Sequence, residues 1–148
     1  EGETVKILAD GAVHPDVTVA GGAVALAVAA SKVQVGLPYA HILRGLKVEA
    51  GAAAGTAVGK TKRIHAVTLV LLDSINAAVG PDRSDLSEIE FREVRDAMDA
   101  AVPLFTGETY VELPGDYDVD ARLVIRGDRP GPFVLLAVAP ELKTNEMV

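Results

Sequence analysis

The chain has no cysteine and no tryptophan, and aromatic residues make up only 4% of its 148 residues. The absence of cysteine excludes disulfides and thiolate metal sites. The scarcity of aromatic rings weakens any prediction of a sugar-binding platform. No apolar run approaches the ~18 residues that cross a bilayer, since the longest runs, 23–30 and 133–140, are only strand-sized. We therefore predict no membrane insertion.

Basic residues are also too few for a protein that holds nucleic acid tightly. The chain has 14 Lys and Arg against 21 Asp and Glu, a net charge of −7, whereas phosphate contacts require a basic face. The length fits one domain. Because the chain starts with Glu1-Gly2-Glu3, without Met or a basic signal region, we expect it to be a piece of a longer protein.

No pattern typical of a catalytic or nucleotide-binding site is present. The three histidines are scattered, and no Gly-x-Ser-x-Gly elbow occurs. Residues 55–61 resemble a phosphate-binding loop, but three residues instead of four separate the glycines. We therefore predict that the protein is not an enzyme and has no cofactor.

Asp116, Asp118 and Asp120 alternate like the first ligands of a calcium loop. An EF-hand needs Gly at the sixth position and Glu at the twelfth, where this chain has Ala121 and Gly127. A solvated turn is the favoured interpretation because Asp is a common turn former. A looser cation site stays open as the alternative.

Alternating apolar residues predict several strands. The clearest is 63–74, where apolar side chains on both faces predict burial on both sides. Further strands are expected at 108–113, 121–126 and 133–138, between Gly and Pro turns.

The first 36 residues predict short hairpins. The strand 5–8 is followed by an Asp10-Gly11 turn. A second turn at Gly21-Gly22 would place Val19 opposite Val24 and Val17 opposite Leu26. A further strand at 32–35 is expected to point Val33 and Val35 inward.

Four further segments combine features of different structures. Residues 40–47 predict a short helix interrupted by Gly45, and Gly80-Pro81-Asp82 predicts a turn. Residues 85–101 fit two patterns, because Ile89 and Phe91 alternate with charged residues as in a strand, while Phe91, Val94 and Met98 have helical spacing. The family resemblance described below favours a strand at 88–92, followed by an irregular segment with at most one helical turn. The Ala- and Gly-rich residues 50–59 predict a flexible loop.

The predicted fold is mainly β: an antiparallel β-sandwich or a partly open barrel, with short hairpins and at most one or two short helices. We expect residues 1–36 to form a β-hairpin subdomain continuous with the core. Residues 37–148 would form the β-sandwich core, with its flexible loop at 50–59.

The basic residues have one concentration, which consists of Arg44, Lys47, Lys60, Lys62 and Arg63. It lacks the interleaved aromatic rings of a nucleic-acid patch. A contact with the acidic surface of a neighbouring subunit is one interpretation, and ordinary surface charge is the other.

Nearly the whole chain resembles one protein family, the C-terminal region of the tail nozzle proteins of short-tailed bacteriophages (also called hub, stabilisation or tail tubular proteins). The residues that carry the resemblance are in the blocks 102–107, 111–118, 122–126, 132–137, 35–39 and 59–64. One departure is Asp116, where the family pattern has a second Gly beside Gly115.

The resemblance implies a structural virion protein of the phage tail, present in the host cytoplasm during assembly. It implies self-assembly into a ring, sixfold in the family, around the DNA exit channel. The partners would be other copies, adjoining tail or adaptor proteins, and DNA only in transit. The alternative is a receptor- or carbohydrate-binding β-sandwich module.

Overall fold

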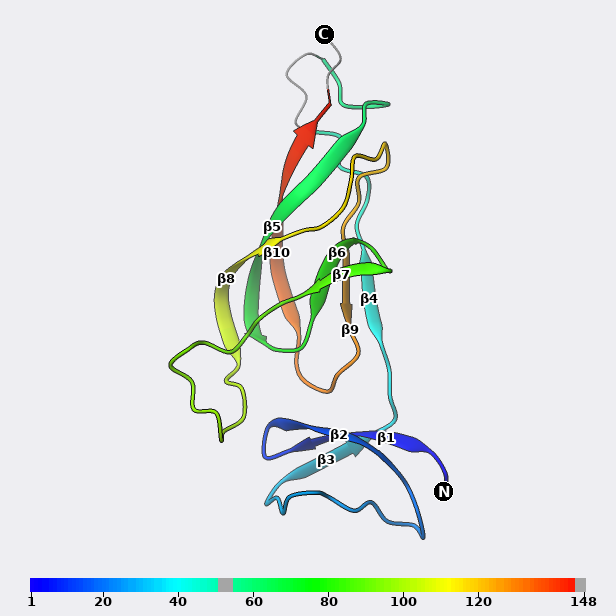
Figure 1. The fold of residues 1–148 in the computed structure, drawn as a ribbon, viewed down its shortest axis with the longest axis vertical. Coiled ribbons are helices and arrows are strands. Elements are labelled where there is room, and N and C mark those ends of the chain that lie inside the picture. The colour runs from blue at the N-terminus through cyan, green and yellow to red at the C-terminus, as the bar shows by residue number, and fades with distance from the viewer. Residues whose placement is uncertain (51–54, 146–148) are drawn as a thin grey trace.

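The computed structural model describes residues 1–50 and 55–145. These residues form three antiparallel sheets and no helix, as Figure 1 shows. The mainly β, sandwich-like prediction is confirmed, and no sheet closes into a barrel among the described residues. The strands are β1 (Thr4–Ala9), β2 (Ala12–Thr18), β3 (Val33–Gly36), β4 (His41–Arg44), β5 (Lys62–Ser74), β6 (Ala78–Asp82), β7 (Asp85–Glu88), β8 (Phe105–Glu112), β9 (Val124–Gly127) and β10 (Val134–Thr144).

The first sheet has the order β2-β1-β3 and lies at one end of the elongated molecule (Figure 1). β1 and β2 are joined by the predicted turn, in which Asp10 and Gly11 have φ values of 48° and 85°. Positive φ at both central residues is typical of the tight turns that match the twist of a hairpin. The first predicted hairpin is therefore confirmed.

The second predicted hairpin is wrong beyond its turn. Gly21 and Gly22 have positive φ, but only a single bridge, between Ala20 and Ala23, joins the two sides. Val17 pairs with Val5 of β1 and not with Leu26. β2 pairs with β1 instead, because the Ala-rich segment that follows the Gly21-Gly22 turn has little tendency to form a strand.

β3 forms as predicted, and its valines lie on the same face of the sheet as the buried Ile7, because Val35 pairs with Ile7 and Val33 with Ala9. Val33 and Val35 are exposed, because β3 is an edge strand of this small sheet. The buried apolar side chains of the sheet are Val5 and Ile7 of its central strand.

Two larger sheets pack face to face, with strand orders β10-β5-β8 and β4-β9-β6-β7. Val67, Leu69 and Leu71 of β5 are fully buried between them, against residues such as Val79 and Ile125. On the other face of β5, Ala66 is fully buried, Thr68 and Val70 are half-buried and Leu72 is exposed. The predicted burial on both faces therefore holds at Ala66 and is lost towards Leu72, because the sandwich has only two layers.

The segment 40–47, expected to be helical, contains the strand β4, which pairs with β9. The backbone N–H of Gly45 continues this pairing by donating to the Leu123 carbonyl at 2.8 Å. Pairing with β9 satisfies the backbone groups that a helix would satisfy internally, and the bulky Ile42 and Leu43 suit a strand.

The predicted turn at Gly80-Pro81-Asp82 is also displaced, because these residues belong to β6. The register shifts between Val79 and Asp82, and such irregularities accommodate proline in a sheet. The chain turns at Arg83-Ser84, where Asp82 Oδ1 accepts hydrogen bonds from the Ser84 N–H and hydroxyl.

The remaining expected boundaries shift by a few residues. β7 ends at Glu88, so the predicted strand 88–92 is wrong, while residues 89–104 are irregular as expected. β10 continues to Thr144, well past the predicted strand 133–138. Within the predicted flexible loop, residues 51–54 lie outside the described residues, and 55–59 contain no strand or helix.

Asp10 holds the end of the long connection before β3. Its carboxylate accepts hydrogen bonds from the backbone N–H groups of Ser31 at 2.9 Å and Lys32 at 2.7 Å. The bond from Ser31, and then that from Lys32, holds the pKa of Asp10 below its ordinary value. A lowered folded-state pKa contributes stability above the unfolded pKa, and this contribution is lost as the pH falls through the folded pKa.

We expect Asp10→Asn to lower the hydrogen-exchange protection of the Ser31 and Lys32 backbone amides at pH 6. The Asn side chain has one acceptor oxygen, whereas the Asp10 carboxylate has two and uses one for each backbone N–H. In the wild type the same protection should fall on acidification below pH ~4. Asn tolerates the positive φ of this position, so the turn itself is preserved. The exposed Asp99→Asn is the control, and unchanged protection in Asp10→Asn would contradict the prediction.

Candidate functional site

An apolar groove lies where the two larger sheets end beside each other. β4 is the last strand of one sheet and β10 the last strand of the other. The groove has a volume of about 210 Å³ and is lined by residues that include Leu43, Leu46, Val48, Ile125, Val138 and Pro140. Leu46 is 85% exposed and Leu43 is 52% exposed. The sandwich thus leaves its apolar interior accessible along this edge. We call this feature the β4/β10 groove.

β10 adds an uncharged, exposed edge to this groove. Residues 133–140 carry no charge, and Val134, Leu136 and Val138 are exposed. Natural edge strands are commonly protected by charges, bulges or proline. β10 has a register shift at Leu136 and a proline at 140. These features disfavour a long added strand, so side-chain docking is the contact that this edge favours.

Three basic side chains converge on Asp120 close to the groove. Lys47 forms an ion pair with Asp120, and Arg122 Nη2 lies 3.8 Å from its second carboxylate oxygen. The hydrogen bond from Lys47 is the main cause that lowers the pKa of Asp120, and the positive charges of Lys47, Arg122 and Arg44 add to it. Arg44 also acts on Asp82, so the three cations and these two carboxylates leave a net charge of +1 here.

The five basic residues predicted as a subunit contact lie in different environments. Arg44 and Lys47 are exposed beside the groove, in the same segment as Leu43 and Leu46. Lys60 and Arg63 are half-buried. The fifth, Lys62, is fully buried.

The Lys62 ammonium is engaged inside the chain. It donates to Glu49 Oε2 at 2.9 Å and to the Ala57 carbonyl at 3.1 Å. Its backbone exchanges two hydrogen bonds of 2.8 Å with Asp118. Lys62 therefore joins three segments of one subunit, and this was not evident from the cluster of charges in the sequence.

The alternating aspartates are used in similar structural roles. Asp118 pairs through its backbone with Lys62, and Asp120 is the ion-pair partner of Lys47. Over residues 1–50 and 55–145, no group of three or more His, Cys, Asp or Glu could hold a metal ion.

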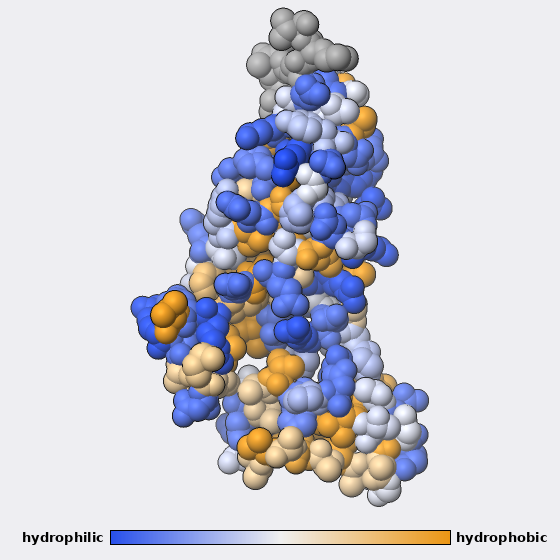
Figure 2. Space-filling model, viewed as in Figure 1, coloured by the Kyte–Doolittle hydropathy of each residue, from blue (hydrophilic) through white to orange (hydrophobic). Residues whose placement is uncertain are grey.

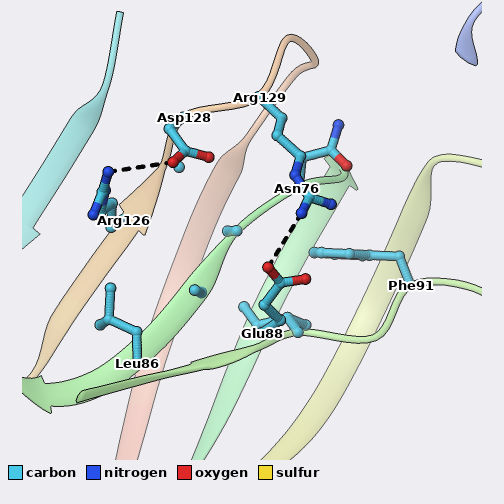
Figure 3. Close-up of a pocket in the computed structure, with 11 residues that line it drawn as sticks. Asn76, Leu86, Glu88, Phe91, Arg126, Asp128 and Arg129 are labelled. Carbon is cyan, nitrogen blue, oxygen red and sulfur yellow. Dashed lines mark hydrogen bonds and ion pairs between the residues drawn. The ribbon is translucent and has the colours of Figure 1, made fainter. Parts of the chain in front are cut away.

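A polar hollow of about 210 Å³ lies beside β6 and β9 and is drawn in Figure 3. Arg126 pairs with Asp128 and Arg129 pairs with Glu88, each at 3.2 Å. The charged side chains that line the hollow are therefore paired with one another. No Ser, Cys or His is among the residues that line it, and its two carboxylates, Glu88 and Asp128, are each paired with an arginine.

The histidines are also used in local contacts. His14 Nε2 accepts a hydrogen bond from the Ala27 N–H at 3.1 Å. His41 stacks on Phe133 with ring centroids 5.5 Å apart, and His65 Nε2 lies 3.4 Å from Glu141.

The loop 89–104 between β7 and β8 was predicted from residue 93 on only as an irregular segment, and its projection from the molecule was not predicted. It projects from the body of the molecule in Figure 1, and the same lobe in Figure 2 is mostly hydrophilic with an apolar patch. Val94 is fully exposed and Met98 is 85% exposed. Their spacing in the sequence fits one face of a helix, but no helix forms here and both side chains lie in solvent.

Arg92 and two aromatic rings hold this loop in shape. The Arg92 guanidinium donates to the carbonyl oxygens of Ala97 at 2.7 Å and Ala100 at 3.0 Å. Phe91 and Phe105 meet edge to face at the root of the loop, with ring centroids 6.2 Å apart. These contacts bring the two ends of the loop together and fix the conformation of the backbone between them.

Among the described residues, no helix could span a membrane. No protein-family model matches the chain, and no curated protein has significant sequence similarity to it.

Proposed function

We propose that this protein is a structural subunit that assembles with copies of itself, and that it forms part of the tail nozzle of a short-tailed bacteriophage. The assembly is a ring around the DNA exit channel, with sixfold symmetry implied by the resemblance. Its neighbours are adjoining tail or adaptor proteins, and it works without catalysis. It resides in the virion tail, and in the host cytoplasm during assembly.

The observation that carries self-assembly is the accessible β4/β10 groove beside the uncharged edge of β10. Exposed apolar surface of this kind is typical of a protein–protein contact, because a monomer gains nothing from leaving it in water. The assignment to a phage nozzle rests on the sequence resemblance. The subunit is elongated and all-β, and its described residues contain no metal-binding cluster. These features are consistent with self-assembly and with a role in a phage nozzle.

The overall charge supports the role proposed for DNA. A net charge of −7 repels phosphates. A channel built from such subunits lets DNA slide without strong attachment.

The first test is multi-angle light scattering of the purified chain at several concentrations, with negative-stain imaging of any large species. We expect a discrete oligomer that appears as closed rings, because apolar contacts that close on themselves stop growing. A strict monomer at the highest concentration would contradict the proposal, and binding of a glycan or receptor would then become the leading function.

A further inference from the structure

The projecting loop and the groove lie at opposite edges of the sandwich. β8 and β7 are the last strands of the two sheets on one side, and loop 89–104 connects them. β10 and β4 are the last strands on the other side, where the groove lies. In Figure 1 the loop accordingly projects beside β8, away from β4. An exposed apolar tip on one edge and an apolar groove on the other are the two halves of a head-to-tail contact.

The tip of the loop has a shape suited to docking. Val94 and Met98 both line a wide, open hollow of the surface, together with Phe91 and Arg92. The Arg92 guanidinium fixes the backbone around these residues through hydrogen bonds to the carbonyl oxygens of Ala97 and Ala100. It also lies 3.7 Å from the Met98 sulfur. A tip that is ordered before it binds loses less entropy on association.

The charges of the two surfaces are opposite. Residues 89–104 carry four carboxylates and two guanidiniums, a net charge of −2. The cations Arg44, Lys47 and Arg122 act on Asp120, and Arg44 also acts on Asp82, so these five groups give a net charge of +1 near the groove. Opposite charges around an apolar contact favour the correct pairing and speed encounter.

We propose that the loop tip of one copy, formed by Val94 and Met98, docks in the β4/β10 groove of the next copy. The contact is heterologous, so each subunit uses its loop on one side and its groove on the other. This inference rests on the proposed self-assembly and names the two surfaces that perform it.

The test uses two variants of the full chain, one for each surface. The loop variant is Val94→Asp with Met98→Asp, and the groove variant is Leu46→Asp. All three side chains are at least 85% exposed, so the fold should survive, and circular dichroism checks this. We expect each variant to self-associate at least about 30-fold more weakly, as for the loss of an interface hot spot. Val28→Asp, at a residue that is 73% exposed in the N-terminal part, is the matched control.

Mixing the two variants separates this contact from others. The loop variant keeps an intact groove and the groove variant keeps an intact loop, so one productive contact remains possible. We expect the mixture to form a one-to-one dimer and nothing larger, measured by sedimentation velocity. In the loop variant, the two added aspartates make the loop more acidic and would strengthen its attraction to the basic groove. A loss of association in this variant therefore reports the loss of the apolar contact.

The outcomes distinguish the two proposals. If the wild type assembles but both variants assemble equally well, or their mixture gives no dimer, the docking contact is overturned while self-assembly stands. If Val28→Asp also prevents assembly, the effect is one of added charge and the docking contact is likewise overturned. If the wild type is a monomer, both proposals are overturned.

Discussion

Leu69→Ala should lower the free energy of unfolding by about 4 kcal/mol, which is within the range for truncating a buried leucine. Leu69 is fully buried in the middle of β5, where the two larger sheets meet. Truncation removes its apolar contacts and leaves a cavity that β-sheets on both sides cannot easily fill. Urea unfolding, followed by circular dichroism, measures the loss.

Leu72→Ala is the matched control, because the same strand carries the same residue type at a position that is 40% exposed. Its expected loss is about 1 kcal/mol or less. Equal losses at the two positions would show that the core does not lie on the face of β5 that we describe.

Glu49→Ala should destabilise the fold by about 2 kcal/mol. Among the described residues, 1–50 and 55–145, it leaves the buried Lys62 ammonium with the Ala57 carbonyl as its remaining hydrogen-bond partner. Removing one partner of a fully buried pair costs about 3–5 kcal/mol. We expect less here because the Glu49 side chain is 33% exposed, so water can approach the site.

The double variant Glu49→Ala with Lys62→Met should recover most of this loss, because Met fills the space of the lysine stem without a buried charge. A complete thermodynamic cycle of the two single variants and the double variant, measured by urea unfolding, gives the coupling between the residues. Additive losses would contradict a direct interaction between Glu49 and Lys62.

The elements that could be predicted are those whose signal is local. The Asp10-Gly11 turn specifies its hairpin through the φ values it allows, and the alternation of Val67, Leu69 and Leu71 specifies β5. By contrast, β4 becomes a strand because β9, far along the chain, pairs with it. A short segment with an ambiguous pattern is decided by such distant partners, which periodicity does not reveal.

The candidate site was predicted only in part for a similar reason. Residue type alone does not distinguish the exposed Arg44 and Lys47 from Lys62, which becomes buried because Glu49 and Ala57 are brought to it. The groove combines residues from β4, β9 and β10, so it exists only after the sheets have packed. The projecting loop depends on Arg92 reaching the carbonyls of Ala97 and Ala100, and sequence spacing gave no sign of it.

The edge-to-face contact of Phe91 with Phe105 has a consequence for symmetry. These rings meet where loop 89–104 leaves the sandwich, so a change in their packing would alter the direction of the loop. In a head-to-tail assembly, that direction relative to the groove fixes the rotation from one subunit to the next, and a small error accumulates at every step around the circle. The number of copies in a closed ring would therefore be encoded by a pair of aromatic rings inside each subunit, and repacking them could turn a ring into an open helix.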